Sequence, residues 1–479
     1  MDETTGSGPL HAVDDTDWSA LAPGGHAIPG LLHDIAGGEG AQRGVDDAVP
    51  ELFDLIRFPG PGYLAAPRVA HHLISIACHP GTPAAWRSRP LSLLLELLAP
   101  TAAVLLPEPR DPSQWRDEVA WAAGTDLEKV RDQYRAWFDD ASDEQRLRHM
   151  AARIDTVARD QGVALLQAER EVHDTVRERV PDLLRLLDGG DNRRGIDSPA
   201  EWACYILAFV PEAAAEVYPA LLRGVGTPAD LPGGSSRDLL SAELFALGML
   251  APPDDPEVTV ALAHVMASGH LYNAFAAAVA LVQIHGERAP REALTRIGRG
   301  GRTNVGYRGL FGDSWPHCGE LAPAVLGFLA LGRAGRRSVE QRIGMLPDVL
   351  AGAEGAGRAA VVGAALEMVL GPRTAAPDHP LEPDTDLDQD TLKVLWSIAD
   401  IPAAAWTESA VGDTVQAWGL PEDRTGFRVF AGVDDAAETD APDPAGSGTG
   451  DPAASAPAPA AAPEPQGGGL LSRLFGGGR

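Results

Sequence analysis

Val180-Pro181-Asp182-Leu183-Leu184 is one copy of a phrase that recurs along the chain. Each copy has an apolar residue, a proline, any residue, and then one or two further apolar residues. Other copies begin at Ile28, Val49, Tyr218, Ala322 and Leu346. Proline fits the first position of a helix, where no N–H is needed and its fixed φ is already helical. A helix start repeated in this way predicts one helical unit copied many times, which is typical of a stacked array.

A second pattern of small and large apolar residues lies between these proline-marked starts. It occurs as Ala242, Ala246, Leu247 and Leu250, and again 34 residues later as Ala276, Ala280, Leu281 and Ile284. Looser copies span 203–210 and 361–369. Small residues let two helices approach closely, while the larger ones fill the groove between them. Because no run of alternating β-branched residues is present, we expect an all-α fold, arranged as an α-α superhelix.

Composition restricts the class of protein and its partners. Of 479 residues, 44% are hydrophobic and 22% are charged, which is typical of a soluble globular protein. The 39 basic and 68 acidic residues give a net charge of −29, so DNA or RNA is not expected as the main ligand. Nearly all the basic residues are arginine, as in a bacterial genome of high GC content. We expect no signal peptide and no transmembrane segment, and the three isolated cysteines favour a cytoplasmic protein.

The chain divides into an array with two kinds of flanking sequence. We expect a disordered N-terminus over 1–16, the helical array over 17–432, and a disordered linker over 433–469. The linker is rich in Ala and Pro and contains seven acidic residues and no basic ones, too few apolar residues to offset the entropy of ordering. Within the array, a segment at about 107–180 is dense in charge and aromatic residues. It is interpreted either as solvated helices packed on the array by their aromatic stripe or as a distinct recognition module.

A short apolar motif over 470–476 follows the linker. Leu470, Leu471, Leu474 and Phe475 fall within one and a half turns of a helix. Their full burial would contribute roughly 1.5–3 kcal/mol each, before the entropy of ordering the tail is subtracted. The motif is therefore a candidate for weak docking to a protein groove or a membrane surface. The alternative is an inert terminus.

A basic, glycine-rich stretch interrupts this acidic sequence. Ten arginines and four acids between Arg288 and Arg342 give that range a charge of +6. A candidate patch for an anion or a partner consists of Arg299, Arg302, Arg308, Arg336 and Arg337. The alternative is a loop between repeats with solvated arginines. No Gly-Lys-Ser/Thr follows the glycines, which excludes a P-loop.

Two groups of residues that resemble metal sites do not meet the requirements of one. His71, His72 and His79 lie near Cys78, but the chain contains neither Cys-x-x-Cys nor His-Glu-x-x-His. The acids of 384–390 lack the glycine and the final carboxylate of a calcium loop. They are better interpreted as the start of a helix, with Asp386 or Asp388 near the cap and with Leu392, Leu395 and Trp396 on the buried face. We therefore expect no metal.

Several of these motifs together resemble the HEAT-repeat, or armadillo-like helical, family, and in particular bacterial HEAT-repeat proteins without an assigned chemistry. The likeness covers roughly 17–432. It lies in Asp17-Trp18-Ser19-Ala20-Leu21, Ile28-Pro29-Gly30-Leu31-Leu32, Tyr63-Leu64-Ala65-Ala66-Pro67-Arg68-Val69, the stretch 180–188 and Gly419-Leu420-Pro421. The sequence departs from that pattern at Ala70-His71-His72, where apolar residues are usual.

The resemblance implies an α-solenoid that contacts other proteins, and it supplies no catalytic or cofactor-binding residues. We expect a monomeric, non-enzymatic scaffold or adaptor that favours a basic protein partner, because the chain is strongly acidic. One alternative is an immunity-type inhibitor of a basic toxin or nuclease. Another is a nucleic-acid-binding HEAT protein that uses the Arg288–Arg342 region.

Overall fold

The computed structural model is helical throughout the part of the chain that it describes, which comprises residues 9–37, 44–100, 112–141, 144–188, 198–225, 241–268, 271–302, 323–371 and 387–433. Within these ranges there is no β-strand. The expected all-α fold is therefore confirmed.

The helices fall into four groups along the sequence. The first holds α1 (Trp18–Leu21), α2 (Ile28–Ala36), α3 (Val45–Ile56), α4 (Ala66–Cys78) and α5 (Ala84–Leu98). The charged segment forms α6 (Pro112–Gly124), α7 (Leu127–Asp139), α8 (Glu144–Val157) and α9 (Gly162–Glu178). Next come α10 (Val180–Leu186), α11 (Pro199–Ala208), α12 (Ala214–Val225), α13 (Ser241–Leu250), α14 (Pro256–Ser268), α15 (Leu271–His285), α16 (Arg291–Arg302), α17 (Pro323–Gly332), α18 (Val339–Gly352) and α19 (Gly355–Leu370). The last are α20 (Gln389–Ala399), α21 (Ala403–Glu408), α22 (Val411–Gln416) and α23 (Arg424–Phe430).

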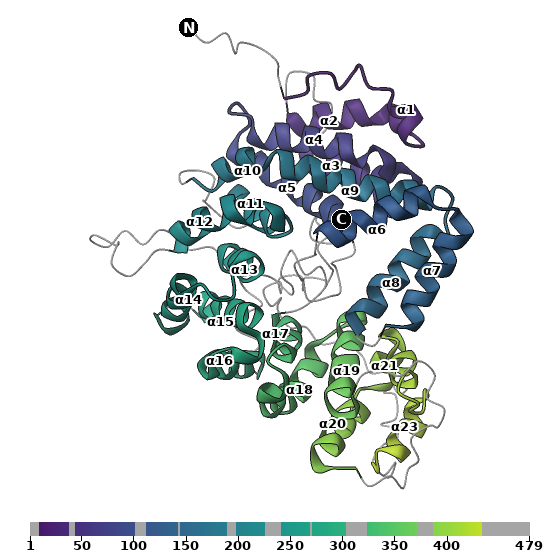
Figure 1. The fold of residues 1–479 in the computed structure, drawn as a ribbon, viewed down its shortest axis with the longest axis vertical. Helices are drawn as coiled ribbons and strands as arrows, with labels where there is room; N and C mark the ends of the chain where they lie inside the picture. Colours follow the sequence, from purple (N-terminus) through teal and green to yellow (C-terminus); the bar gives the residue numbers. More distant parts are fainter. Residues whose placement is uncertain are drawn as a thin grey trace, which may run out of the picture.

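Helices α10 to α20 pack in two rows. Helices α11, α13, α15, α17 and α19 each contact the next member of one row. In the other row, α10 contacts α12, α12 contacts α14, α16 contacts α18, and α18 contacts α20. Figure 1 shows α13 and α17 on the inner side of an open arc and α14 and α18 outside them. We call these two sets of helices the inner row and the outer row.

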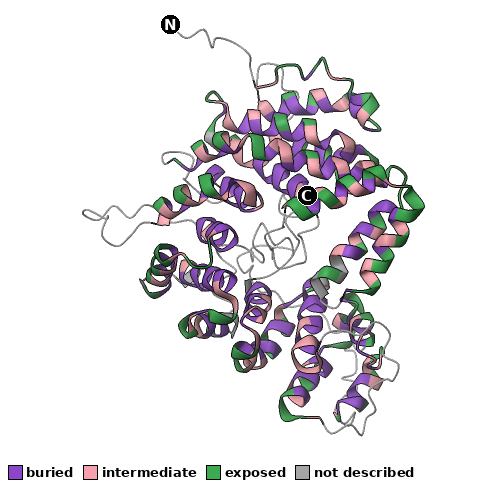
Figure 2. Ribbon diagram, viewed as in Figure 1, coloured by how far each residue is buried: buried purple, intermediate pink, exposed green. Residues whose placement is uncertain are grey.

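Two helices of the inner row, α13 and α15, are buried on all of their sides. Every residue of α13 from Ala242 to Leu250 is buried, and so is every residue of α15 from Ala274 to Ile284. A helix without a polar face is stable only where it is covered all round. Figure 2 shows this difference, because exposed positions gather on the outer helices. The alanine–leucine stripes found in the sequence lie on α11, α13, α15 and α19.

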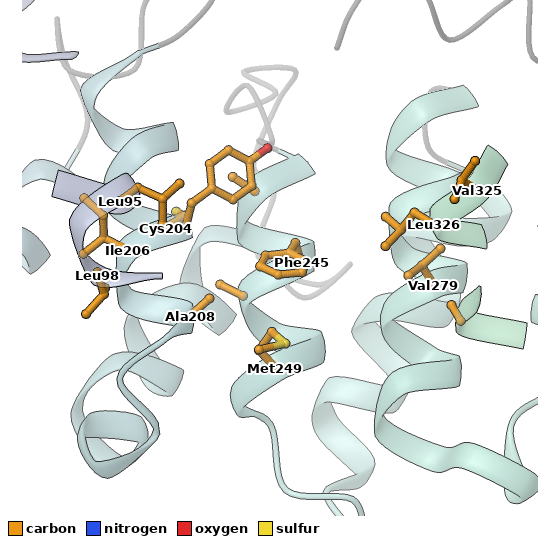
Figure 3. Close-up of a cluster of buried hydrophobic side chains, with 14 of the residues drawn as sticks. Leu95, Leu98, Cys204, Ile206, Ala208, Phe245, Met249, Val279, Val325 and Leu326 are labelled. Carbon is orange, nitrogen blue, oxygen red and sulfur yellow. The ribbon is translucent and has the colours of Figure 1, made fainter. Parts of the chain in front are cut away.

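The inner row continues directly from α11 to α5, although α6 to α10 separate them in sequence. Helix α5 packs against α11, and α4 packs against both α9 and α10. Figure 3 shows Leu95 and Leu98 of α5 next to Ile206 of α11, with Phe245 of α13 beyond them. Helices α6 to α9 are therefore an insertion between two neighbours of the inner row.

This insertion has a hydrophobic core of its own. Trp115, Val119, Tyr134, Met150 and Leu166 form a cluster separate from the main core. The expectation that the aromatic stripe packs on the array is therefore wrong for most of it, since these side chains pack on one another. Helix α9 links the two cores, because Leu166 belongs to the small core and Val172 to the main one.

A buried charge pair fixes α8 to α9 inside the insertion. The Arg153 side chain is 2% exposed, and its Nη1 donates to Oε2 of Glu169, which is fully buried, at 2.5 Å. Glu118 Oε1 lies 3.4 Å from Arg153 Nε and accepts a hydrogen bond from the Tyr134 hydroxyl at 2.9 Å. Two carboxylates that face one buried guanidinium favour its charged form.

The recurring prolines mark helix starts in only part of the chain. Pro29 and Pro181 are the second residues of α2 and α10, and Pro323 is the first residue of α17. The same expectation is wrong for Pro50, Pro219 and Pro347, which lie inside α3, α12 and α18.

Burial explains why these three helices begin before their prolines. The residues just ahead of each proline lie on the buried face, as Val49, Val217 and Leu346 do. Extending each helix backward therefore buries more apolar surface, which offsets the backbone hydrogen bond that proline removes.

The start of α20 was identified correctly from the sequence, whereas its buried face was only partly predicted. Asp388 caps the helix, because its carboxylate accepts a hydrogen bond from the Thr391 N–H at 2.8 Å. Leu395 is buried as expected. Trp396 is instead 44% exposed, and its indole N–H donates to the Ala431 carbonyl at 2.8 Å. That hydrogen bond holds the ring against the residues that directly follow α23, outside the core.

Among the described residues, no single helix has the length and apolar character needed to cross a bilayer. One pair of segments, Pro199–Ala208 and Pro211–Val225, meets that requirement only when taken together, and it is bent by 101°.

Candidate functional site

A hollow of about 570 Å3, bordered by several charged and polar residues, lies between α4, α9 and the segment that precedes α1. We call it the α4–α9 hollow. Helix α4 contributes Arg68, His71 and His72, and α9 contributes Glu171, Asp174 and Glu178. Two helices that are far apart in sequence thus place opposite charges around one space.

Packing of α9 on α4 fixes the direction of the acidic wall. Val172 and Val176 of α9 are fully buried in the main core. Glu171, Asp174 and Glu178 follow at steps of three and four residues, so they share a different face of the helix. This face borders the hollow. Thr175 lies on the same border, and its hydroxyl donates a hydrogen bond to the Glu171 carbonyl at 2.8 Å.

The segment before α1 closes one side of the hollow with His11, Ala12 and Thr16. It is anchored by Val13, which is fully buried and whose carbonyl accepts a hydrogen bond from the Trp18 indole N–H at 2.7 Å. Ala12 has φ of 62°, in the left-handed region that residues other than glycine seldom adopt. The anchored segment therefore holds a strained backbone at the edge of the hollow.

The two adjacent histidines of α4 are held in the neutral form. His72 is 6% exposed, and its ring lies 6.0 Å from Trp18 and 5.6 Å from His71. Burial, together with the charges of His71 and Arg68, lowers the pKa of His72 to about 4. Burial and Arg179 also lower the pKa of His71. Both imidazoles therefore present hydrogen-bonding groups without a positive charge at neutral pH.

Asp174 differs from the two glutamates because its charge is already compensated. The Arg116 guanidinium bridges Asp174 and Glu212, and the Glu212 contact is 2.6 Å. Through Asp174, this bridge ties α6 to α9, and Glu212 adds the turn before α12. By contrast, Arg68, Glu171 and Glu178 form no ion pair within the part of the chain that the structure describes. These three charges are therefore available to a ligand.

Metal binding is not supported by the arrangement of the histidines. In the described ranges, no group of three or more His, Cys, Asp or Glu side chains is placed to hold a metal ion. Cys78 lies at the end of α4, and burial raises the pKa of its thiol to about 11, which disfavours the thiolate that binds metals.

The three arginines of the predicted basic patch whose side chains are described are all exposed. Arg299 on α16 and Arg336 are exposed. Arg337 is exposed too, and its Nη1 donates to the carbonyls of Glu287 and of Ala289, the latter at 3.0 Å, so it joins two turns between helices. Arg302 ends α16, but its side chain lies outside the described residues, as does all of Arg308. The patch as a unit stays a prediction.

Other arginines of the same region have internal partners. Arg342 is 6% exposed, donates to the Ala364 carbonyl at 2.8 Å and lies over the Phe328 ring at 4.6 Å. Arg296 donates to the Met266 carbonyl at 3.1 Å. The charge of +6 counted from the sequence therefore overstates the positive charge available at the surface.

The predicted apolar docking motif Leu470, Leu471, Leu474 and Phe475 lies outside the described residues, and so does the linker from 434 to 469. Both stay predictions.

Sequence reasoning singled out His71 and His72 but missed the hollow beside them. The pair His71-His72 was a signal, since it places two polar rings in a stretch that is otherwise largely apolar. The spacing of the three acids on α9 was a second signal. Their juxtaposition depends on the contact between α4 and α9, which no local pattern encodes.

Comparisons of the chain with protein-family models, with curated proteins and with solved structures return no match in any of the three.

Proposed function

We propose that this chain is a HEAT-like α-solenoid that acts as a non-enzymatic scaffold or adaptor for a protein partner with a basic surface. We also propose that it works as a monomer in the cytoplasm. Size-exclusion chromatography with light scattering tests whether the protein is a monomer.

The observation that carries the proposal is the regular contact pattern of the two rows. Each inner helix from α11 to α19 touches the next inner helix, and its burial depends on neighbours that repeat the same arrangement. Arrays built in this way are stabilised between neighbours and present extended surfaces for other macromolecules. This supports a binding role rather than a reaction in an enclosed cavity.

The charge of the chain supports a basic partner. A net charge of −29 attracts cationic surfaces and raises association rates by about 10–1,000-fold at low salt. The burial of Arg342 and the internal partner of Arg296 leave fewer cations at the surface to attract a nucleic acid. The proposal therefore favours protein over DNA or RNA.

Affinity capture from the native host, followed by purification of the captured protein, tests the proposal. We expect binding of the purified pair, measured by calorimetry, to weaken at least tenfold between 50 and 500 mM NaCl, because salt screens charge attraction. A 20-base-pair duplex DNA serves as the matched probe and should not bind at 150 mM NaCl. Equal affinity at both salt concentrations, or tighter binding to the DNA, would contradict the proposal.

A further inference from the structure

We propose that the α4–α9 hollow binds a basic residue that carries a free carboxylate, either as a free amino acid such as arginine or as the last residue of a peptide. This goes beyond the proposed scaffold function and does not depend on it. Arg68 would hold the carboxylate, while Glu171 and Glu178 would hold the cationic groups.

The first step is that opposite charges border one space without neutralising each other. Arg68 lies on α4, while Glu171 and Glu178 lie on α9. In the described part of the chain, none of the three is within an ion pair. A ligand with a carboxylate at one end and cationic groups elsewhere would complete both sides. Arginine–carboxylate contacts are among the strongest that such a ligand makes, because two N–H groups can donate in parallel.

The second step is the net charge of the hollow. Asp174 is paired with Arg116, and the burial of His72 together with the lowered pKa of His71 keeps both imidazoles neutral near pH 7. Among the Arg, Asp and Glu side chains that border the hollow, the charges without an ion-pair partner in the described residues are then one positive, from Arg68, and two negative, from Glu171 and Glu178. Free arginine and lysine have one carboxylate and two cationic groups, so they match this count. The last residue of a peptide keeps the carboxylate and the side-chain cation but has no α-ammonium group, so it matches the count except for one cation.

The third step is the size and rigidity of the space. A volume of about 570 Å3 lies within the range of about 300–1,000 Å3 that is usual for small-ligand sites. Two walls are helices with buried faces, and the third is anchored by Val13 and the Trp18 hydrogen bond. The walls are therefore fixed before a ligand binds, and binding has to order mainly the exposed side chains of Arg68, Glu171 and Glu178.

Calorimetry on the full chain tests the proposal with three small probes at pH 7.5 and low salt. We expect L-arginine to bind at millimolar concentration or below. Agmatine, which lacks the carboxylate, and L-citrulline, which lacks the side-chain charge, should bind at least tenfold more weakly. Equal binding of agmatine, or no heat from L-arginine at 10 mM, would overturn the proposal.

The two sources of the ligand are separated by a tripeptide. Gly-Gly-Arg with a free carboxylate should bind like L-arginine if the hollow accepts the end of a peptide, and its C-terminal amide should not. If L-arginine binds and both tripeptides fail, the ligand is the free amino acid.

Variants connect the binding to the hollow. Arg68→Ala and Glu171→Gln should each weaken L-arginine binding at least tenfold, with unchanged far-UV circular dichroism. Arg288→Ala is the matched control, because Arg288 forms an exposed pair with Asp254 at 3.3 Å on another part of the molecule. A loss of binding as large in Arg288→Ala, or unchanged binding in both hollow variants, would contradict the assignment.

Discussion

His72 illustrates how one buried side chain makes the stability of this protein depend on pH. It is 6% exposed, and burial together with the charges of His71 and Arg68 lowers its pKa from 6.5 to about 4. The hydrogen bond to the Pro9 carbonyl opposes this shift but does not cancel it. Between these two pKa values the unfolded chain binds a proton that the folded chain does not.

We therefore expect His72 to destabilise the fold as pH falls from 6.5 to 4. Because folding lowers this pKa, the stability that depends on neutral His72 is fully present above pH 6.5 and is lost as the pH falls towards 4. The loss in unfolding free energy is on the order of 3 kcal/mol. Urea unfolding of wild type and His72→Gln at several pH values measures this loss of unfolding free energy. The difference in unfolding free energy, wild type minus variant, should grow as pH rises through this window.

A second titratable group, the half-buried Glu96, makes the comparison with a variant necessary. Burial raises the pKa of Glu96 to about 7, so Glu96 favours the folded state at low pH and loses that contribution as pH rises through 7. This slope opposes that of His72 in the wild-type curve, but it cancels in the difference. Gly30→Ala removes no titratable group and fills a position where a Cβ would meet nothing within 4 Å, so it is the control and should give a flat difference curve. A flat difference curve for His72→Gln would refute the expectation.

At the scale of the helix, local sequence predicted the inner row well and the helix starts less well. The alanine–leucine stripes identified α11, α13, α15 and α19 because close helix contact requires small residues at a fixed spacing. The prolines inside α3, α12 and α18 led to wrong predictions of where these helices begin, because tertiary burial outweighed the local cost of proline. The α4–α9 hollow was not predictable for the same reason. Its walls meet only through contacts between distant helices.

Gly248 tests how closely the inner helices must approach. A Cβ at this position would lie 2.6 Å from Gln283 Oε1 and 2.9 Å from the Ala280 Cα, both on α15. We expect Gly248→Ala to push α13 away from α15 and to destabilise the fold by about 1–3 kcal/mol, as overpacking does. Urea unfolding monitored by circular dichroism measures the change.

Gly30 of α2 provides the matched control. A Cβ there would meet nothing within 4 Å. Gly30→Ala should therefore be neutral or stabilising by up to about 1 kcal/mol, because alanine is the better helix former. Similar destabilisation by both variants would show that helix propensity, rather than the α13–α15 contact, controls the result.

For the whole molecule, two separate hydrophobic cores imply two regions of separate stability. The main core runs from the segment before α1 to the region of α23, whereas α6 to α9 enclose the small core around Tyr134. Among the helices that the structure describes, α9 alone contributes buried residues to both, through Leu166 on one side and Val172 on the other. Local opening of the insertion should therefore leave the inner row intact.

Hydrogen exchange on two cavity variants tests this separation. Tyr134 and Phe275 are both fully buried, the first in the small core and the second on α15 of the inner row. Truncation of either side chain to alanine costs about 3–5 kcal/mol locally. We expect Tyr134→Ala to speed amide exchange in α6, α7 and α8 and to leave α13, α15 and α17 protected. Phe275→Ala should do the reverse, because its neighbours are the inner helices. If either variant speeds exchange equally in both regions, the two cores unfold as one unit, and the insertion is then as much a part of the array as α11 or α13.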